Sequence, residues 1–232
     1  MSPVQLVKEK FREYYVDKGP EGGILQGMKY AGASTHCSNC LHTITKILQP
    51  KRVLEIGSMN YATSSAIGYA MDEYGVGRVD SFDIRVGGYH GNYSAPSNHR
   101  VNAYYWMPYH TDYDAWKYNH AEKQEFKKLS NDEIYQKNKQ TLLDLLDGEK
   151  YDMIFIDGDH SFEGVSRDYK LGNEVCTEDC LFVIDNVWDV RLQEVRDFYE
   201  SLTVEKWDFE EWNDEFFEKN MVQDTAICVK SE

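Results

Sequence analysis

Two short acidic segments contain the side chains best suited to bind a metal ion. Asp157 and Asp159 belong to the segment Asp-Gly-Asp-His, and Asp185 is followed directly by Asn186. Carboxylate and amide oxygens are the ligands that hard divalent cations such as Mg²⁺ prefer. Asp, Asn and Gly are also frequent in turns, so a turn is the alternative reading. Because two such segments end neighbouring predicted strands, we interpret Asp157, Asp185 and Asn186 as candidate metal ligands.

His160 is a candidate general base, because it follows Asp157 by three residues and would start the next helix near the proposed ion. Imidazole titrates near neutral pH and can therefore accept a proton from a reacting hydroxyl. Asp159 is the second candidate for this role. A histidine at this position can equally cap the helix or bond a neighbouring carboxylate, and both interpretations stay open.

A second group of residues suits an adenosine-containing ligand. Glu55, Gly57 and Ser58 lie where a strand is expected to turn into a helix, and Asp83 ends the next expected strand. Glycine lets the backbone pass close to a ligand, and the helix offers its N-terminal amides to a carboxylate. A carboxylate at the second strand end can accept two hydrogen bonds from a ribose diol. Together these residues predict a nucleoside site.

Short apolar runs that alternate with helical stretches are expected to position these residues. Strands are predicted at 52–56, 78–84, 151–157 and 180–185, and the helices before them at 40–48, 63–74, 141–146 and 162–175. Buried runs spaced by helices indicate parallel strands covered on both faces. After a helix at 191–202, the strand-like segments 205–212 and 221–230 have no long helix between them. This spacing predicts an antiparallel pair at one edge of the sheet.

Residues 85–130 break this rhythm. The segment shows no clear periodicity and is rich in Tyr, Trp, His, Gly and Asn. Long irregular insertions are usually functional or disordered, and disordered chains lack aromatic residues. We therefore favour an ordered lid or substrate wall, with Trp106 and Trp116 as candidate substrate contacts, over a purely structural insertion. A short strand is expected after it, near 133–137.

The composition predicts one soluble domain over residues 1–232, with an N-terminal helical cap at about 1–48. The net charge of −15 opposes binding to phosphate backbones and anionic membranes, so neither nucleic acid nor membrane is an expected partner. No signal peptide or apolar membrane span is evident, and five cysteines do not suggest a disulfide framework. A cytoplasmic protein is expected, and a homodimer is compatible with the sequence. Cys37 and Cys40 are expected to pack within a helix.

With these residues in view, the chain resembles the class I S-adenosylmethionine-dependent methyltransferases, specifically methyltransferase family 24. The segment YDMIFIDGDHSFEGVSRDY looks like the signature of that group, VLEIGSMNYATS like the first methyltransferase motif, and SFDI like the acidic ribose-binding strand end. The resemblance implies an α/β fold with a Rossmann-like, doubly wound, mostly parallel seven-stranded sheet. It also implies the residues that contact S-adenosylmethionine, namely Glu55, Gly57, Ser58, Asp83, Ile84 and Asp157.

The chain is also similar to the metal-dependent O-methyltransferases that act on catechols and caffeoyl-CoA. Their metal ligands correspond to Asp157, Asp185 and Asn186, and their catalytic lysine to His160. Trp188 resembles the tryptophan that lines the substrate site of the caffeoyl-CoA enzymes. Gln140 falls where that family contacts the adenine.

Two departures from these families limit what the resemblance implies. Tyr61 stands where the first motif normally carries a second glycine, and a bulky side chain there would crowd the methionine part of the cofactor. The insertion is not typical of small catechol-type enzymes, so their substrates are not carried over. We expect Mg²⁺-dependent methylation of a hydroxyl on a small molecule or a sugar. The alternatives are a non-catalytic cofactor-binding protein and another nucleotide-using enzyme on the same fold.

Overall fold

A seven-stranded sheet forms the centre of the molecule, with strand order β3-β2-β1-β4-β5-β7-β6. The computed structural model describes residues 1–15, 35–58, 61–84, 96, 98–110, 127–209 and 225–231. The strands are β1 (Arg52–Ile56), β2 (Arg78–Asp83), β3 (Val101–Tyr105), β4 (Tyr151–Ile156), β5 (Cys176–Ile184), β6 (Lys206–Trp207) and β7 (Ala226–Val229). Strands β1 to β5 pair in parallel, whereas β7 is antiparallel to both β5 and β6. The predicted parallel sheet with an antiparallel C-terminal edge pair is confirmed.

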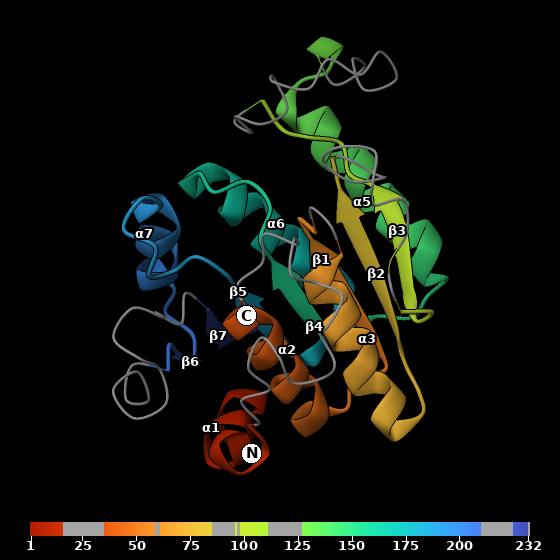
Figure 1. The fold of residues 1–232 in the computed structure, drawn as a ribbon. Coiled ribbons are helices and arrows are strands. Elements are labelled where there is room, and N and C mark those ends of the chain that lie inside the picture. Colours follow the sequence, from red (N-terminus) through yellow and green to blue (C-terminus); the bar gives the residue numbers. More distant parts are fainter. Residues whose placement is uncertain are drawn as a thin grey trace.

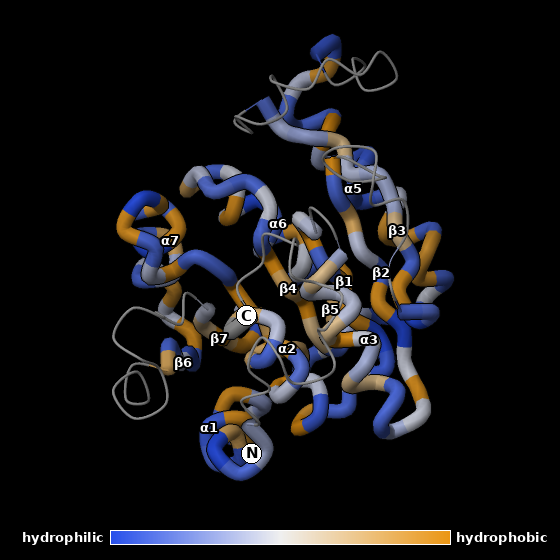
Figure 2. The backbone as a smooth tube through the Cα atoms, viewed as in Figure 1, coloured by the Kyte–Doolittle hydropathy of each residue, from blue (hydrophilic) through white to orange (hydrophobic). Residues whose placement is uncertain are grey.

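Helices cover both faces of this sheet (Figure 1). They are α1 (Pro3–Tyr14), α2 (Thr35–Leu48), α3 (Ala62–Tyr74), α5 (Asn131–Leu146), α6 (Phe162–Val175) and α7 (Gln193–Ser201). Core residues of α1, α2 and α3 pack on one face, and those of α5, α6 and α7 on the other. Val53 and Leu54 are neighbours in β1 and point to opposite faces, as the period of a strand requires. Figure 2 shows β4 as a largely hydrophobic segment inside this sandwich.

The start of α6 is well defined, which matters because the Asp-Gly-Asp-His segment leads into it. The Ser161 hydroxyl caps the helix by accepting a hydrogen bond of 3.0 Å from the Gly164 amide. Further along, a Cβ atom on Gly172 would lie 2.6 Å from Phe182 of β5. The helix is therefore held close to the sheet at one end and capped at the other, which fixes the segment before it.

Several element boundaries differ from the sequence predictions. Residues 85–130 were expected to lack regular structure, yet β3 lies within them and pairs with β2. The strand predicted near 133–137 is wrong, because Ser130 and Glu133 form a capping box that starts the helix α5 there. Strand β5 begins at Cys176 rather than at residue 180. These differences change individual elements and leave the predicted, mostly parallel sheet with its antiparallel edge pair intact.

Other expectations of the sequence have mixed outcomes. Cys37 and Cys40 are buried in α2, as expected, and none of the five cysteines, all of which lie in the described residues, forms a disulfide. Within the part of the chain that is described, no helix has the length and apolarity needed to cross a bilayer. Trp116 lies outside the described residues, so its predicted role as a substrate contact stays a prediction.

Candidate active site

The carboxyl ends of β4 and β5 bring Asp157, His160 and Asn186 into one hydrogen-bonded cluster. The Asn186 amide nitrogen donates to the Asp157 carboxylate at 2.7 Å, and His160 Nε2 lies 3.1 Å from the same oxygen. His160 Nε2 also lies 3.2 Å from the Asn186 amide nitrogen. The sheet itself holds these residues, because the Asp157 and Asp185 amides extend its hydrogen bonding one residue past each strand. The predicted metal and base residues therefore gather at one edge.

Asp185 is held from the opposite side of the site. Its carboxylate accepts a hydrogen bond of 2.9 Å from the hydroxyl of Thr225, which is fully buried just before β7. Thr225 was not predicted from the sequence, since a lone threonine before a strand carries no signal. Antiparallel pairing of β7 with β5 places it there.

Asn186 adopts a left-handed backbone conformation with φ of 63°. Asparagine enters this region more readily than most residues, although it still costs energy. The turn after β5 needs this conformation at a position whose side chain bonds Asp157. Backbone strain of this kind often accompanies functional sites.

The pKa of His160 is raised above its ordinary value by its acidic neighbours. Burial alone lowers the pKa, but the hydrogen bond and charge of Asp157 outweigh that effect, with help from the charges of Asp185 and Asp159. The imidazole therefore keeps its proton to a higher pH than a free histidine does. Neutralising the carboxylates would lower this pKa, so His160 would lose its proton at a lower pH.

The turn after β1 lies directly against this cluster. Gly57 has φ of 87°, and a Cβ atom there would overlap the backbone carbonyl of Asp157. Only glycine satisfies both the conformation and the close approach. The Ser58 amide donates to the Asp83 carboxylate at 3.0 Å, which ties the turn to the end of β2. Gly57, Ser58 and Asp83 are thus brought together beside Asp157, as the cofactor interpretation requires.

Glu55 lies beneath this turn, in the interior of the sheet, rather than at an open surface. Its carboxylate is fully buried and accepts hydrogen bonds from the hydroxyls of Thr63, at 2.5 Å, and Ser81. Burial raises its pKa to about 7, against the opposing effect of hydrogen bonds from Ser81, Thr63 and Ser64. The carboxylate links β1, β2 and the start of α3, which makes it a support for the turn.

Glu55→Gln is expected to flatten the pH dependence of stability. The folded pKa of Glu55 lies above that of the unfolded chain, so ionisation costs stability as pH rises from about 4.5 to about 7. The full cost is about 3 kcal/mol. Glutamine fills the same space and cannot ionise, so the fall in melting temperature between pH 5 and pH 8 should shrink. Thermal unfolding of both proteins at several pH values measures this, and identical pH profiles would contradict it.

Tyr61 occupies the position where the first motif normally carries glycine, and it adopts a conformation that glycine favours. Its φ is 62°, in the left-handed region, at the residue that precedes α3. The side chain is buried, with 2% of its surface exposed. The turn has therefore kept a glycine-like backbone while admitting a tyrosine ring.

The remaining predicted residues lie in different environments. Asp159 accepts a hydrogen bond of 3.0 Å from the Ser161 amide, and a Cβ atom on Gly164 would overlap its carboxylate, so it packs against the start of α6. Trp106 is buried and packs edge-on against Phe82 in the core. Each therefore makes contacts typical of a structural residue, and their proposed roles in the site stay predictions.

Three further predicted residues differ in how close they lie to the cluster. Gln140 is exposed in the middle of α5, where it bonds Asp144 at 2.7 Å, and the structure does not bring it together with the cluster. Ile84 is half-buried and packs against the core after β2. Trp188, two residues after Asn186, is half-buried, and its ring faces the Arg196 guanidinium at 4.3 Å. Of these, Trp188 is the one placed to line a pocket beside the site.

Comparison with known proteins assigns this arrangement to a family. The Methyltransf_24 family, described as a methyltransferase domain, matches residues 54–187, which is more than half of the chain. The chain belongs to this family, within the class I S-adenosylmethionine-dependent methyltransferases. A search of curated proteins finds no match.

Solved structures with the same fold are similar over nearly the whole chain. The O-methyltransferase TomG from Streptomyces achromogenes, in complex with SAM, is 15% identical with a TM-score of 0.51, covering 99% of this chain and 88% of TomG. An O-methyltransferase from Bacillus cereus in complex with SAH is 15% identical with a TM-score of 0.54, covering 98% and 91%. Cofactor-bound Rv0187 from MTB is 14% identical with a TM-score of 0.55, covering 95% and 96%. At these identities the likeness establishes the fold.

Proposed function

We propose that the protein transfers a methyl group from S-adenosylmethionine to a hydroxyl oxygen of a small molecule or sugar, with the help of a divalent cation. The observation that carries this proposal is the cluster of Asp157, His160 and Asn186 packed against the Gly57 turn. In this arrangement the residues proposed as proton acceptor and oxygen ligands lie next to the turn proposed for the cofactor, which supports the proposal. The O-methyltransferases among the similar structures, bound to SAM or SAH, support oxygen as the acceptor.

The residues of the cluster fit a hard cation by their chemistry. Asp157, Asp185 and Asn186 offer two carboxylates and an amide, the oxygen ligands that Mg²⁺ favours. Among the described residues, no group of three or more His, Cys, Asp and Glu side chains is arranged to hold a metal. The proposed site therefore depends on the Asn186 amide as its third ligand. This amide now turns its nitrogen to Asp157, and rotation by half a turn would present its oxygen. Thr225 already orients Asp185.

The chain's own residues would act on the proton and on the geometry of transfer. When bound, the cofactor would supply the methyl group from its sulfonium, and a cation would lower the pKa of the acceptor hydroxyl. His160 takes the hydroxyl proton as the new O–C bond forms and the S–C bond breaks. The Gly57 turn and Asp83 would hold the cofactor beside the acceptor, and such positioning lowers the barrier to transfer.

Mn²⁺ binding to wild-type protein and Asp185→Asn tests the cation without knowledge of the acceptor. Water-proton relaxation should show one Mn²⁺ per chain, with affinity at least about tenfold weaker in Asp185→Asn because one charged ligand is lost. Asp197→Asn is the matched control, since Asp197 is an exposed carboxylate that bonds Gln193 within α7. Equal affinities for all three proteins would contradict the proposed cation site.

A further inference from the structure

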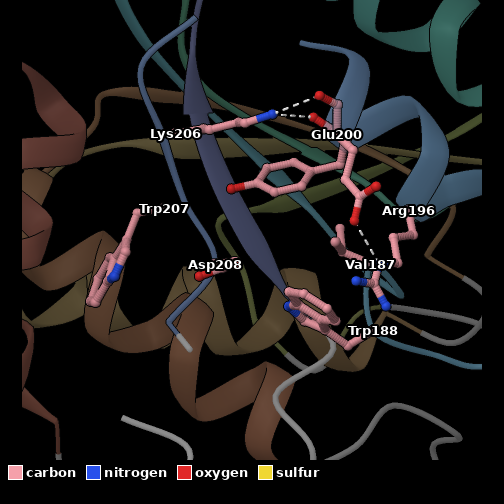
Figure 3. A pocket seen from close by; sticks show the side chains of 8 residues that line it. Val187, Trp188, Arg196, Glu200, Lys206, Trp207 and Asp208 are labelled. Carbon is pink, nitrogen blue, oxygen red and sulfur yellow. Dashed lines mark hydrogen bonds and ion pairs between the residues drawn. The ribbon is translucent and has the colours of Figure 1, made fainter. Parts of the chain in front are cut away.

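A pocket of about 290 Å³ lies beside the cluster, between α7 and the end of β6 (Figure 3). Val187 and Trp188 line it from the segment that follows Asn186; Arg196, Tyr199 and Glu200 line it from α7, and Lys206, Trp207 and Asp208 from β6 and the residue after it. Ligand pockets in proteins measure roughly 300–1,000 Å³, so this one suits a single ring rather than an extended ligand.

Strand pairing places this pocket at the same edge of the sheet as the cluster. β7 is antiparallel to both β5 and β6, so β6 runs in the direction of β5. Trp207 pairs with Ile227, which in turn pairs with Val183 of β5. Asp208 therefore lies level with Ile184, at the carboxyl end of the sheet. Two strand spacings, or about 10 Å, separate these two residues. Asp157, at the end of β4, is one strand spacing further, about 14 Å from Asp208. Val187 and Trp188 follow Asn186 directly and bridge this gap, so a ligand that runs along them from the pocket would approach Asp157 and His160.

The wall of the pocket combines an aromatic face with charged hydrogen-bonding groups. The Arg196 guanidinium lies over the Trp188 ring, and its Nε donates to Glu200 at 2.8 Å. The Trp188 indole N–H is buried and meets no hydrogen-bond acceptor among the described residues. A buried donor of this kind normally has an acceptor, so a ligand oxygen would satisfy it.

The charges of the pocket balance, which disfavours an anionic ligand. Lys206 is committed to the fold, because its ammonium donates to the carbonyls of Tyr199, Glu200 and Leu202 and so caps the end of α7. Arg196 is paired with Glu200, whose side chain is 57% exposed and can turn to a ligand. Asp208 adds a second carboxylate. Phosphate groups would meet two carboxylates here, whereas hydroxyl groups can donate to both.

We propose that this pocket binds the sugar ring of a glycosyl acceptor whose neighbouring hydroxyl is methylated, an assignment that rests on the function proposed above. A sugar has an apolar face that can pack against the aromatic side chains of the wall, and hydroxyls that can bond the Trp188 indole N–H and the charged side chains. A planar phenol offers the pocket no hydroxyls beyond those that react. Glu200, Arg196 and Asp208 therefore favour a polyhydroxylated ring over an aromatic one.

Saturation-transfer NMR with defined probes tests this assignment. The probes are the methyl glycosides of glucose, mannose and rhamnose, with catechol as the aromatic comparator, each added to full-length protein with S-adenosylhomocysteine and Mg²⁺. At least one glycoside should bind, and Glu200→Gln should weaken it roughly tenfold, as expected for loss of a charged hydrogen bond. Asp197→Asn is the matched control: Asp197 is exposed on the same helix, bonds Gln193 at 2.8 Å and lies outside the pocket.

The outcomes separate this assignment from the proposed function. Glycoside binding that Glu200→Gln weakens and Asp197→Asn leaves unchanged supports the sugar pocket. The assignment is overturned if no glycoside binds, if Glu200→Gln binds the glycosides as tightly as the wild-type protein does, or if only catechol binds. Calorimetry of S-adenosylhomocysteine on the same samples tests the proposed function by itself. Cofactor binding without glycoside binding would therefore reject only the sugar pocket.

Discussion

Replacing Asp157 with asparagine is expected to lower methyl transfer by at least about 100-fold, the typical lower contribution of acid–base catalysis. The Asp157 carboxylate contacts both Asn186 and His160, so its loss removes a proposed cation ligand and the partner of the proposed base. Transfer from labelled S-adenosylmethionine to the glycosides and catechol measures the effect. Asp152→Asn is the control, because Asp152 lies in the same strand and bonds Lys51 and Arg52 at the opposite end.

The same variant should also lower the pKa of His160. The hydrogen bond and charge of Asp157 are the main causes that raise this pKa against the effect of burial. With both removed, burial and the weaker charges of Asp185 and Asp159 remain, so the imidazole should lose its proton at a lower pH. NMR titration of histidine in the metal-free protein reports the shift directly. An unchanged His160 titration in Asp157→Asn would show that the two side chains do not interact as described.

Gly57→Ala is expected to be the most destabilising single substitution near the site and to abolish cofactor binding. A Cβ atom there would overlap the Asp157 carbonyl, and φ of 87° is strained for alanine. The backbone of the turn would have to move away from β4, at a cost of about 3 kcal/mol or more. Thermal unfolding should show a fall in melting temperature of roughly 10 °C for a chain of this size.

Gly75→Ala separates the stability cost of steric overlap at Gly57 from the cost of a left-handed backbone conformation. Gly75 has φ of 85°, nearly the same as Gly57, but a Cβ atom there meets nothing within 4 Å. Its substitution should cost about 1 kcal/mol from conformation alone and leave cofactor affinity unchanged. If both variants lost equal stability, contact between the Gly57 turn and Asp157 would not be the source of the effect.

The sequence was sufficient for much of the fold because the relevant signals are local. Short, mostly apolar runs at 52–56 and 151–156 mark strands that are largely buried, and they are followed by Gly57 and Asp157. The cluster of Asp157, His160 and Asn186 follows from this pattern, since parallel strands end at the same edge. β3 was missed because it is an edge strand with a mixed sequence, VNAYY, and one neighbour.

The parts of the site that were not predicted depend on contacts between distant segments. Thr225 reaches Asp185 across 40 residues because β7 pairs antiparallel with β5. Glu55 stays a predicted cofactor contact, whereas its bonds to Thr63 and Ser81, which hold the carboxylate inside the sheet, were not predicted. A carboxylate near a strand end can point into the sheet or toward a ligand. Packing in three dimensions decides between these directions, and residue type and spacing alone do not predict it. The pocket beside Trp188 likewise forms only when α7 packs beside β6.

Calorimetric titration of the wild-type protein with S-adenosylhomocysteine, with and without Mg²⁺, tests the central claim most directly. The Gly57 turn, Ser58 and Asp83 are tied together beside Asp157, and we expect them to bind one cofactor molecule per chain under both conditions. His160 and Asn186 lie in the adjacent cluster and not in the turn that would hold the cofactor. Cofactor binding should therefore not require the cation. Absence of binding at about 1 mM ligand, a free energy weaker than about −4 kcal/mol, would contradict the assignment of this edge as a methyltransferase site.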